Sequence, residues 1–144
     1  MRKIFLICIF IMICLSGCFR VDGPYPFRQE TNQIQKIEIR MKEYDSVSLA
    51  VPTILLKILD SSEHQAFVEA VQAVPGNRLY TNISQGIGMY QVWIYYLDGE
   101  TEVFGAYNNG YVLPDGTWHL DCYIFDIPQF HQMLERFLRM EISE

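Results

Sequence analysis

Apolar and polar residues alternate along much of the chain, and this two-residue period predicts β-strands. In residues 34–42, isoleucine and methionine alternate with lysine, glutamate and arginine, which indicates a strand with one buried and one solvated face. Residues 54–59 form a denser apolar run. In residues 89–97 neither face is polar, so both sides of that strand are expected to be covered. Further strands are predicted at 47–51, 100–107, 111–113 and 117–125.

Glycine-containing turns separate several of these strands. Asp98-Gly99 joins two alternating runs, and a two-residue loop of this composition predicts a type I′ hairpin, because both turn positions need a positive φ. Two more turns are marked by Asn109-Gly110 and Pro114-Asp115-Gly116. Short hairpin connections of this kind make consecutive strands antiparallel.

Helical spacing of apolar residues occurs twice. Asp60 and Glu63 have the spacing of a capping box, and the apolar residues that follow predict a helix over about 60–74. Asp126 is the expected cap of a second helix over about 127–140. Strand runs interrupted by two separate helices predict an α+β fold, in which an antiparallel sheet of about five to six strands carries both helices on one face.

The first residues of the chain have the pattern of an export signal. Arg2 and Lys3 precede an unbroken apolar run over residues 4–15. The run has 12 residues and would form a helix about 18 Å long. A helix that spans a bilayer needs roughly 20 residues, so this run is too short. The run is therefore expected to be the apolar core of a signal peptide.

The sequence Leu15-Ser16-Gly17-Cys18, which ends this leader, resembles the lipobox of bacterial lipoproteins. The resemblance implies that the Cys18 thiol is alkylated with diacylglycerol and that signal peptidase II cuts before Cys18. It also implies a palmitate-type lipid anchor that holds the protein on the extracytoplasmic face of the cell membrane. The residue pattern alone also allows an ordinary signal peptide that contains a cysteine, or an N-terminal membrane anchor.

The chain is expected to have three parts. Residues 1–17 are the lipoprotein signal peptide, residues 18–33 are the lipidated cysteine and a flexible tether, and residues 34–144 are a single α+β domain. The tether is predicted because this stretch contains glycine and two prolines and has no apolar period. The mature chain would keep Cys18 and Cys122, and since Cys18 carries lipid, no intramolecular disulfide is expected.

Composition narrows the classes of protein to consider. Half of the 144 residues are hydrophobic and 19% are charged, which excludes a disordered chain. The formal charge is −6, and removing a leader with two basic residues would take it to −8. A negative balance argues against nucleic-acid binding, so the expected contacts are the membrane, through the lipid, and an envelope protein, peptide or glycan.

Motifs for catalysis are scarce in this sequence. It contains no G-x-S-x-G elbow, no Walker loop and no H-E-x-x-H pair. His119 and Asp121 are two apart on a predicted strand and, with Tyr123, are expected to project from the same face. Such a pair can supply two metal ligands, or a base with its orienting carboxylate. A solvated strand face has the same pattern, so no enzymatic activity, metal or cofactor is expected.

Aromatic residues concentrate in the region of the hairpins. Tyrosine and tryptophan offer a large, rigid contact area with a polar tip and are favoured in binding surfaces. They are also common in sheets, where they pack across strands. Both interpretations apply to one set of candidate binding residues: Tyr90, Trp93, Tyr95, Tyr96, Tyr107, Tyr111, Trp118 and Tyr123.

The order of predicted elements resembles that of small uncharacterised lipoproteins of Gram-positive bacteria, over roughly residues 34–140. The leading hypothesis is a membrane-anchored, non-enzymatic domain that binds a protein, a peptide or a cell-wall ligand. A second hypothesis is an inhibitory, accessory or immunity-type lipoprotein that blocks a hydrolase or toxin, since the acidic mature chain suits a cationic target. A third is a hydrolase or metal site that uses His119 and Asp121.

Overall fold

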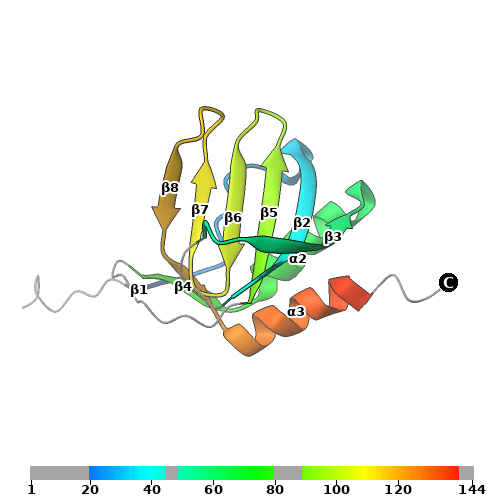
Figure 1. Ribbon diagram of the computed structural model, residues 1–144. Coiled ribbons are helices and arrows are strands. Elements are labelled where there is room, and N and C mark those ends of the chain that lie inside the picture. Colours follow the sequence, from blue (N-terminus) through cyan, green and yellow to red (C-terminus); the bar gives the residue numbers. More distant parts are fainter. Residues whose placement is uncertain (1–19, 45–48, 80–88, 140–144) are drawn as a thin grey trace, which may run out of the picture.

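The computed structural model describes residues 20–44, 49–79 and 89–139, and its main element is a six-stranded antiparallel sheet (Figure 1). The strand order is β3-β2-β5-β6-β7-β8. This sheet consists of β2 (Ile34–Lys42), β3 (Thr53–Leu59), β5 (Tyr90–Tyr96), β6 (Thr101–Gly105), β7 (Asn109–Val112) and β8 (Trp118–Asp121). With two helices beside it, this sheet confirms the predicted α+β fold and its strand count.

A second, three-stranded antiparallel sheet was not predicted. Its order is β1-β4-β9, and it consists of β1 (Arg20–Asp22), β4 (Gly76–Leu79) and β9 (Tyr123–Phe125). Strands of three or four residues carry too little periodicity to be recognised in a sequence.

The two helices begin close to their predicted positions. A 3₁₀ turn at Ser61–Glu63 leads into α2 (His64–Ala73), and the Asp60 amide donates to Glu63 Oε2 at 2.8 Å in the expected capping box. In α3 (Ile127–Arg139), Asp126 Oδ1 accepts a hydrogen bond from the amide of Gln129 at 3.0 Å, as an N-cap does.

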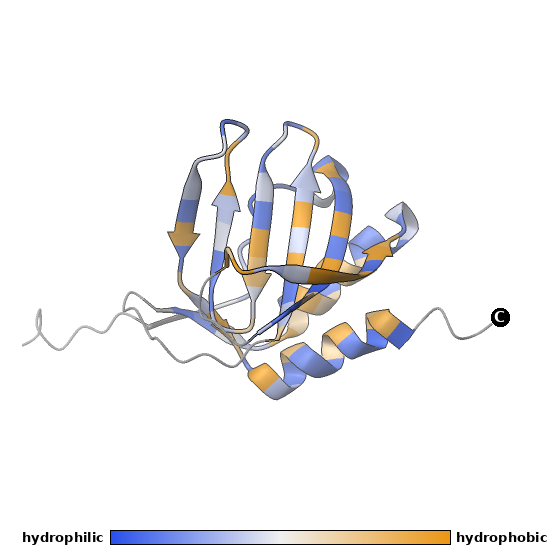
Figure 2. Ribbon diagram, in the orientation of Figure 1, coloured by the Kyte–Doolittle hydropathy of each residue, from blue (hydrophilic) through white to orange (hydrophobic). Residues whose placement is uncertain are grey.

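One face of the six-stranded sheet, called the inner face below, belongs to the hydrophobic core. Ile37, Ile39, Val92, Ile94 and Phe104 on this face share one buried cluster with residues of both helices. The helix residues in this cluster are Phe67, Val68 and Val71 of α2 and Phe130, Met133, Leu134 and Phe137 of α3. Apolar and polar bands alternate along the sheet strands and along α3 (Figure 2), so the cluster and the polar surface follow directly from the sequence periodicity.

The segment before β2 belongs to the domain, which corrects the predicted tether. Its β1 strand pairs with β4, and Tyr25 is completely buried in the core cluster, where its ring lies 4.6 Å from that of Phe104. The prolines that suggested a flexible linker flank this buried tyrosine. A single aromatic anchor has no period, which is why the sequence pattern did not reveal it.

The Asp98-Gly99 hairpin has a different turn from the predicted one. The amide of Tyr96 bonds the carbonyl of Glu100 at 2.9 Å, so the loop has three residues, Leu97-Asp98-Gly99. Only Gly99 has a positive φ, of 88°, whereas a type I′ turn would require one at Asp98 as well. Asp98 Oδ1 instead accepts from the Glu100 amide at 2.9 Å and holds the loop closed.

The single strand predicted at 117–125 is divided between the two sheets. Pairing with β7 ends where Asn109 meets Asp121, because β7 begins at Asn109. The chain then turns at Cys122, and β9 pairs with β4. The strand predicted at 47–51 lies partly outside the described residues, and Leu49 and Ala50 form a turn.

Candidate functional site

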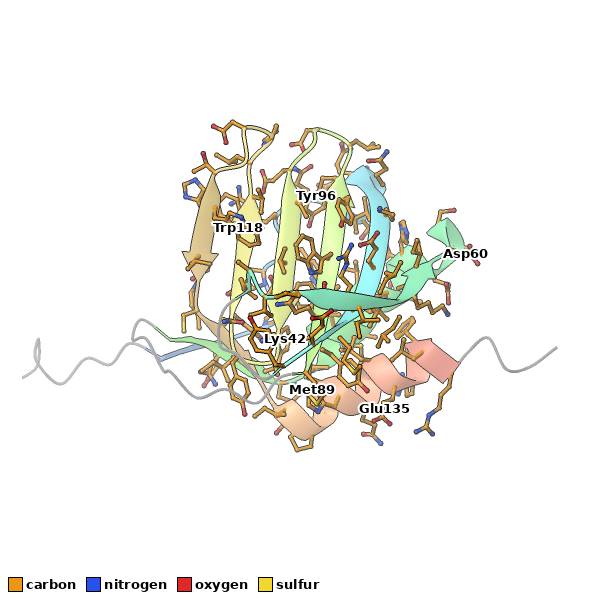
Figure 3. The ribbon with its side chains drawn as sticks, in the orientation of Figure 1. Lys42, Asp60, Met89, Tyr96, Trp118 and Glu135 are labelled. Carbon is orange, nitrogen blue, oxygen red and sulfur yellow. The ribbon has the colours of Figure 1, made fainter. Side chains whose placement is uncertain are left out.

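Three aromatic side chains gather on the face of the six-stranded sheet that lies opposite the core, called the outer face below. Trp93 and Tyr95 are on β5, and Trp118, which is labelled in Figure 3, is on β8. The ring centroids of Trp93 and Trp118 are 6.2 Å apart with perpendicular planes, and those of Trp93 and Tyr95 are 6.5 Å apart at 29°. These three residues are called the aromatic face.

The strands between these rings carry smaller side chains, which lets distant strands share one surface. Trp93 pairs with Val103, and Val103 pairs with Gly110. A Cβ added at Gly110 would approach the carbonyl oxygen of His119 to 2.6 Å, so this position accepts no side chain. The edge-to-face contact between Trp93 and Trp118 therefore spans two intervening strands.

Charged residues of the neighbouring strand β2 lie over two of these rings. The Lys36 ammonium is 4.2 Å from the centroid of the Tyr95 ring, and the Arg40 guanidinium is 4.9 Å from that of Trp93. Both distances are those of cation–π contacts. The register explains them, since Lys36 is the direct partner of Tyr95 across the β2–β5 ladder.

Glu38 lies between the two cations and joins them to the aromatic face. Its carboxylate is 2.7 Å from Lys36 Nζ and 2.6 Å from Arg40 Nη2, and it accepts a hydrogen bond from the Tyr95 hydroxyl at 3.0 Å. Burial by itself raises the pKa of Glu38, but the hydrogen bonds from Lys36, Arg40 and Tyr95 outweigh burial and lower that pKa below its ordinary value. Burial and this carboxylate in turn raise the pKa of Tyr95.

The indole of Trp93 is also fixed by hydrogen bonds. Its Nε1 donates to Gln91 Oε1 at 3.0 Å, and Gln91 Nε2 donates to the carbonyl of Leu49 at 3.3 Å. Leu49 is buried and so covers this end of the outer face. Leu49 also covers the outer face at β7, since a Cβ on Gly110 would approach Leu49 Cδ1 to 3.3 Å.

The other five candidate aromatic residues lie elsewhere. Tyr96 (labelled in Figure 3) and Tyr123 are buried in the core cluster, and Tyr90 and Tyr107 pack against it half-buried. Tyr111 is on β7, and its ring stacks with that of His119 at 4.8 Å. A sequence alone does not say on which side of the sheet a strand with two apolar faces places each ring.

His119 and Asp121 line a pocket of about 430 Å³ at the β7–β8 end of the inner face. Asp121 forms an ion pair with Arg78 of β4, and its Oδ1 accepts from the Cys122 amide at 2.8 Å. Burial raises the pKa of Asp121, but these two partners lower it below its ordinary value. Tyr123, expected beside them, belongs to β9 and donates its hydroxyl to the carbonyl of Gly23 at 2.6 Å.

These contacts leave His119 and Asp121 in separate interactions, the one stacked on Tyr111 and the other paired with Arg78. A base with an orienting carboxylate requires a hydrogen bond between the two. The described part of the chain holds no group of three or more His, Cys, Asp or Glu side chains that could bind a metal ion.

The chain matches no known family model, no curated protein and no solved structure.

Glu102 is the functional candidate that the sequence did not reveal. It lies at the same pocket, and its carboxylate accepts hydrogen bonds from the Tyr25 hydroxyl at 2.7 Å, the Tyr96 hydroxyl and the Arg28 amide at 3.1 Å. Burial raises the pKa of Glu102 above its ordinary value. Glu102 lies in a strand of alternating polar and apolar residues, and nothing in the sequence indicates that its side chain points into the core. That position depends on Tyr25, which is buried beside it.

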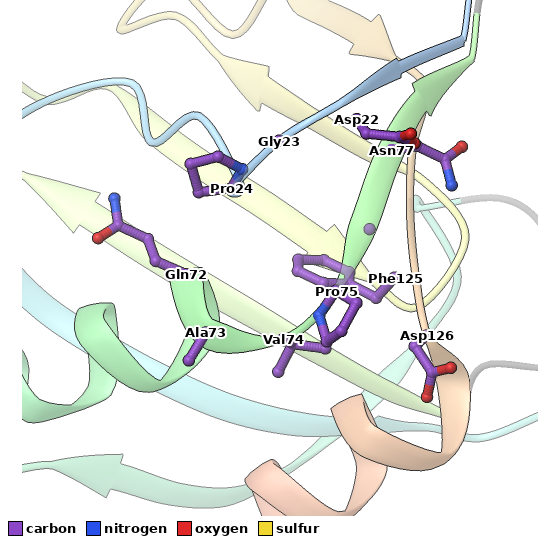
Figure 4. A pocket seen from close by; sticks show the side chains of 11 residues that line it. Asp22, Gly23, Pro24, Gln72, Ala73, Val74, Pro75, Asn77, Phe125 and Asp126 are labelled. Atoms are coloured by element: carbon purple, nitrogen blue, oxygen red, sulfur yellow. The ribbon is translucent and has the colours of Figure 1, made fainter.

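Another hollow, of about 520 Å³, lies where β1 and β4 meet the end of α2 (Figure 4). Its lining includes Pro24, Pro75 and Gly76 and two carboxylates, Asp22 and Asp126, of which Asp126 is the N-cap of α3. None of the residues predicted to form a site lines this hollow.

Among the described residues, the longest helix has 13 residues, and none is long and apolar enough to cross a bilayer.

Proposed function

We propose that this protein is a lipid-anchored, extracytoplasmic binding domain that holds an envelope ligand on the aromatic face and carries out no chemistry on it. The observation that carries the proposal is the group of rings on the outer face, where Trp118 is 38% exposed and Trp93 and Tyr95 are partly exposed. Soluble domains seldom leave several tryptophan and tyrosine rings adjacent on one open surface without a partner.

The rings are held in position before any ligand arrives. Trp93 is fixed by Gln91 and Arg40, and Tyr95 by Glu38 and Lys36. Ordering a side chain on binding costs about 0.5–1.5 kcal/mol, and residues that are already ordered avoid that cost. Such prior order supports a binding role for this surface.

The charges beside the rings indicate the chemistry of the ligand. Lys36 and Arg40 contribute two positive charges against the single carboxylate of Glu38, in a chain whose formal charge is −6. The Lys36 side chain is 41% exposed and can reach a ligand. A flat apolar or sugar surface next to a negative group fits this combination, as an acidic protein segment or an anionic wall glycan would supply.

Anchoring at Cys18 is the other half of the proposal, and it is tested separately. Cells that express the protein are labelled with radioactive palmitate, and label is expected in the wild type and absent in Cys18→Ser. If the wild type takes up no label, or if Cys18→Ser keeps it, the anchor is wrong while the binding surface remains open to test.

The binding surface is tested by photo-crosslinking in intact envelopes. A benzophenone amino acid replaces Trp118 in one variant and Leu97 in another, since Leu97 is 62% exposed but lies in the β5–β6 loop. In parallel, purified cell walls are sedimented with the wild type, Trp118→Ala and Leu97→Ala.

A discrete adduct at position 118, or sedimentation that is lost only in Trp118→Ala, supports the aromatic face and identifies the ligand as protein or glycan. Equal behaviour of the 118 and 97 variants in both experiments would contradict the proposal.

A further inference from the structure

The connection between the proposed anchor and the folded domain is very short. Strand β1 begins at Arg20, two residues after Cys18. Two residues span at most about 7 Å even when fully extended. If Cys18 is lipidated, as proposed above, its backbone therefore lies within that distance of the start of β1, and the bilayer lies only one side chain and one glycerol group farther.

Residues 20–25 are bound to the domain and do not act as a flexible hinge. Arg20 to Asp22 pair with β4, the Gly23 carbonyl accepts from the Tyr123 hydroxyl at 2.6 Å, and Tyr25 is completely buried against Glu102. Releasing β1 would break these contacts. The side of the domain that carries β1 is consequently the side that faces the membrane.

Strand β8 is the part of the large sheet that lies on this side. In the small sheet β1 is two strands from β9, which corresponds to about 10 Å. The chain enters β9 directly from β8 through Cys122, and Arg78 of β4 forms an ion pair with Asp121 of β8. Figure 1 shows β1 and β8 on the same side of the molecule, whereas β3 runs across the front of the sheet and ends on the opposite side.

The side chains of β8 suit a membrane surface. This strand is an edge of the sheet, and its Leu120 is 75% exposed, the largest fraction among the exposed large hydrophobic residues of the described chain. Trp118, two residues earlier, is 38% exposed. Tryptophan is favoured at the level of lipid headgroups, and exposed leucine gains free energy by entering the apolar boundary below them. Arg78 balances the charge of Asp121 beside them.

We propose that the β8 edge rests on the bilayer that holds the anchor, with Leu120 in the apolar boundary and Trp118 at the level of the headgroups, where its ring still contacts a ligand. The aromatic face begins at this edge, so a bound ligand would lie alongside the membrane surface. The occupant of the exposed edge is the bilayer because the short covalent connection keeps this edge close to it.

The test measures how close each edge of the sheet comes to lipid. In a background of Trp93→Phe and Trp118→Phe, Leu120→Trp places a single indole on β8, and Leu55→Trp places one on β3. Leu55 is the matched control because it is a leucine on the opposite edge strand and 46% exposed. Along the sheet, five strand spacings separate the two edges.

The lipidated full-length variants are purified from membranes and reconstituted into phosphatidylcholine–phosphatidylglycerol vesicles that contain brominated lipid. Flotation of the vesicles first shows whether the protein is anchored. The fluorescence of Leu120→Trp is then expected to be largely quenched, while Leu55→Trp keeps most of its intensity. Inserting a flexible glycine–serine segment before Arg20 is expected to reduce the quenching of Leu120→Trp.

Flotation with equal quenching of the two probes would overturn the orientation and leave the anchor intact. A protein that does not float would overturn the anchor, and with it the orientation.

Discussion

Two buried glutamates stand on opposite faces of the same sheet, and their surroundings differ. Glu38 on the outer face is bound by two cations, Lys36 and Arg40. Glu102 on the inner face is bound by two tyrosine hydroxyls and a backbone amide, with no cation in direct contact through a side chain. Both carboxylates are nearly inaccessible to solvent.

The difference shows what burial does to a carboxylate with and without a cation bonded to it. The pKa of Glu38 is lowered, because hydrogen bonds from Lys36, Arg40 and Tyr95 more than offset burial, whereas the pKa of Glu102 is raised, because burial prevails over its neutral donors and the charge of Arg28 nearby. The outer-face site therefore holds its charge at neutral pH and orders the aromatic face. The inner-face site fastens the N-terminal segment to the core through Tyr25.

The largest effect on stability is expected when the contact between Glu102 and the N-terminal segment is removed. Tyr25→Ala removes a fully buried ring and one hydrogen-bond donor to Glu102, and should lower the free energy of unfolding by about 3–5 kcal/mol. Urea unfolding followed by circular dichroism measures this value. Tyr44→Ala is the control, since Tyr44 is 56% exposed and its loss should change stability by less than about 0.5 kcal/mol.

An unchanged stability in Tyr25→Ala would mean that the segment before β2 is dispensable for the fold. The short connection to the anchor would then no longer fix the orientation of the domain.

This segment also shows why part of the fold cannot be predicted from the sequence. The strands at 34–42 and 89–97 and both helices have regular periods, and each was predicted within a few residues. Strand β1 and Tyr25 are held by contacts with residues about 50 to 100 positions later in the chain. Such contacts leave no local pattern, so a proline-containing segment with one anchor resembles a linker.

The aromatic face was predictable in kind but not in membership. The sequence shows that tryptophan and tyrosine gather in the hairpins. Trp93 lies on the outer face and Tyr96 in the core only because alternate residues of β5 face opposite sides. The cations over the rings depend on the register between β2 and β5, which is set by the whole sheet.

A smaller effect is expected from neutralising the outer-face glutamate. Glu38→Gln leaves Lys36 and Arg40 without their shared counter-charge and should cost about 1.5–3 kcal/mol of stability at pH 7. Because the pKa of Glu38 is lowered by folding, its contribution is complete above the unfolded value near 4.3 and is lost as the pH falls through the lower folded value. Unfolding of both proteins across pH 2–8 should show the difference between them shrinking on acidification.

The inner-face glutamate should give the opposite dependence on pH. Because folding raises the pKa of Glu102, its contribution is complete below about 4.3 and is lost as the pH rises through the folded value. Glu102→Gln, which resembles the protonated acid, should therefore gain stability relative to the wild type as the pH rises. The change should be about 1 kcal/mol, the scale of a single hydrogen bond. Parallel slopes for the two glutamine variants would refute the comparison.

The smallest effect is expected from removing the charge of Arg40 while keeping its apolar contact with Trp93. Arg40→Met keeps an apolar stem over Trp93 but removes the charge, and a cation–π contact at a partly exposed site is worth about 0.5–1 kcal/mol. The same change takes one of two cations from Glu38, so the pKa of this carboxyl should rise in a carbon-detected NMR titration. It should stay unchanged in Arg139→Met, whose arginine pairs with Glu135 on the exposed surface of α3. If the carboxyl of Glu38 titrates identically in Arg40→Met and the wild type, Arg40 does not set its charge. In that case Lys36 and Tyr95 alone would have to hold the aromatic face in order.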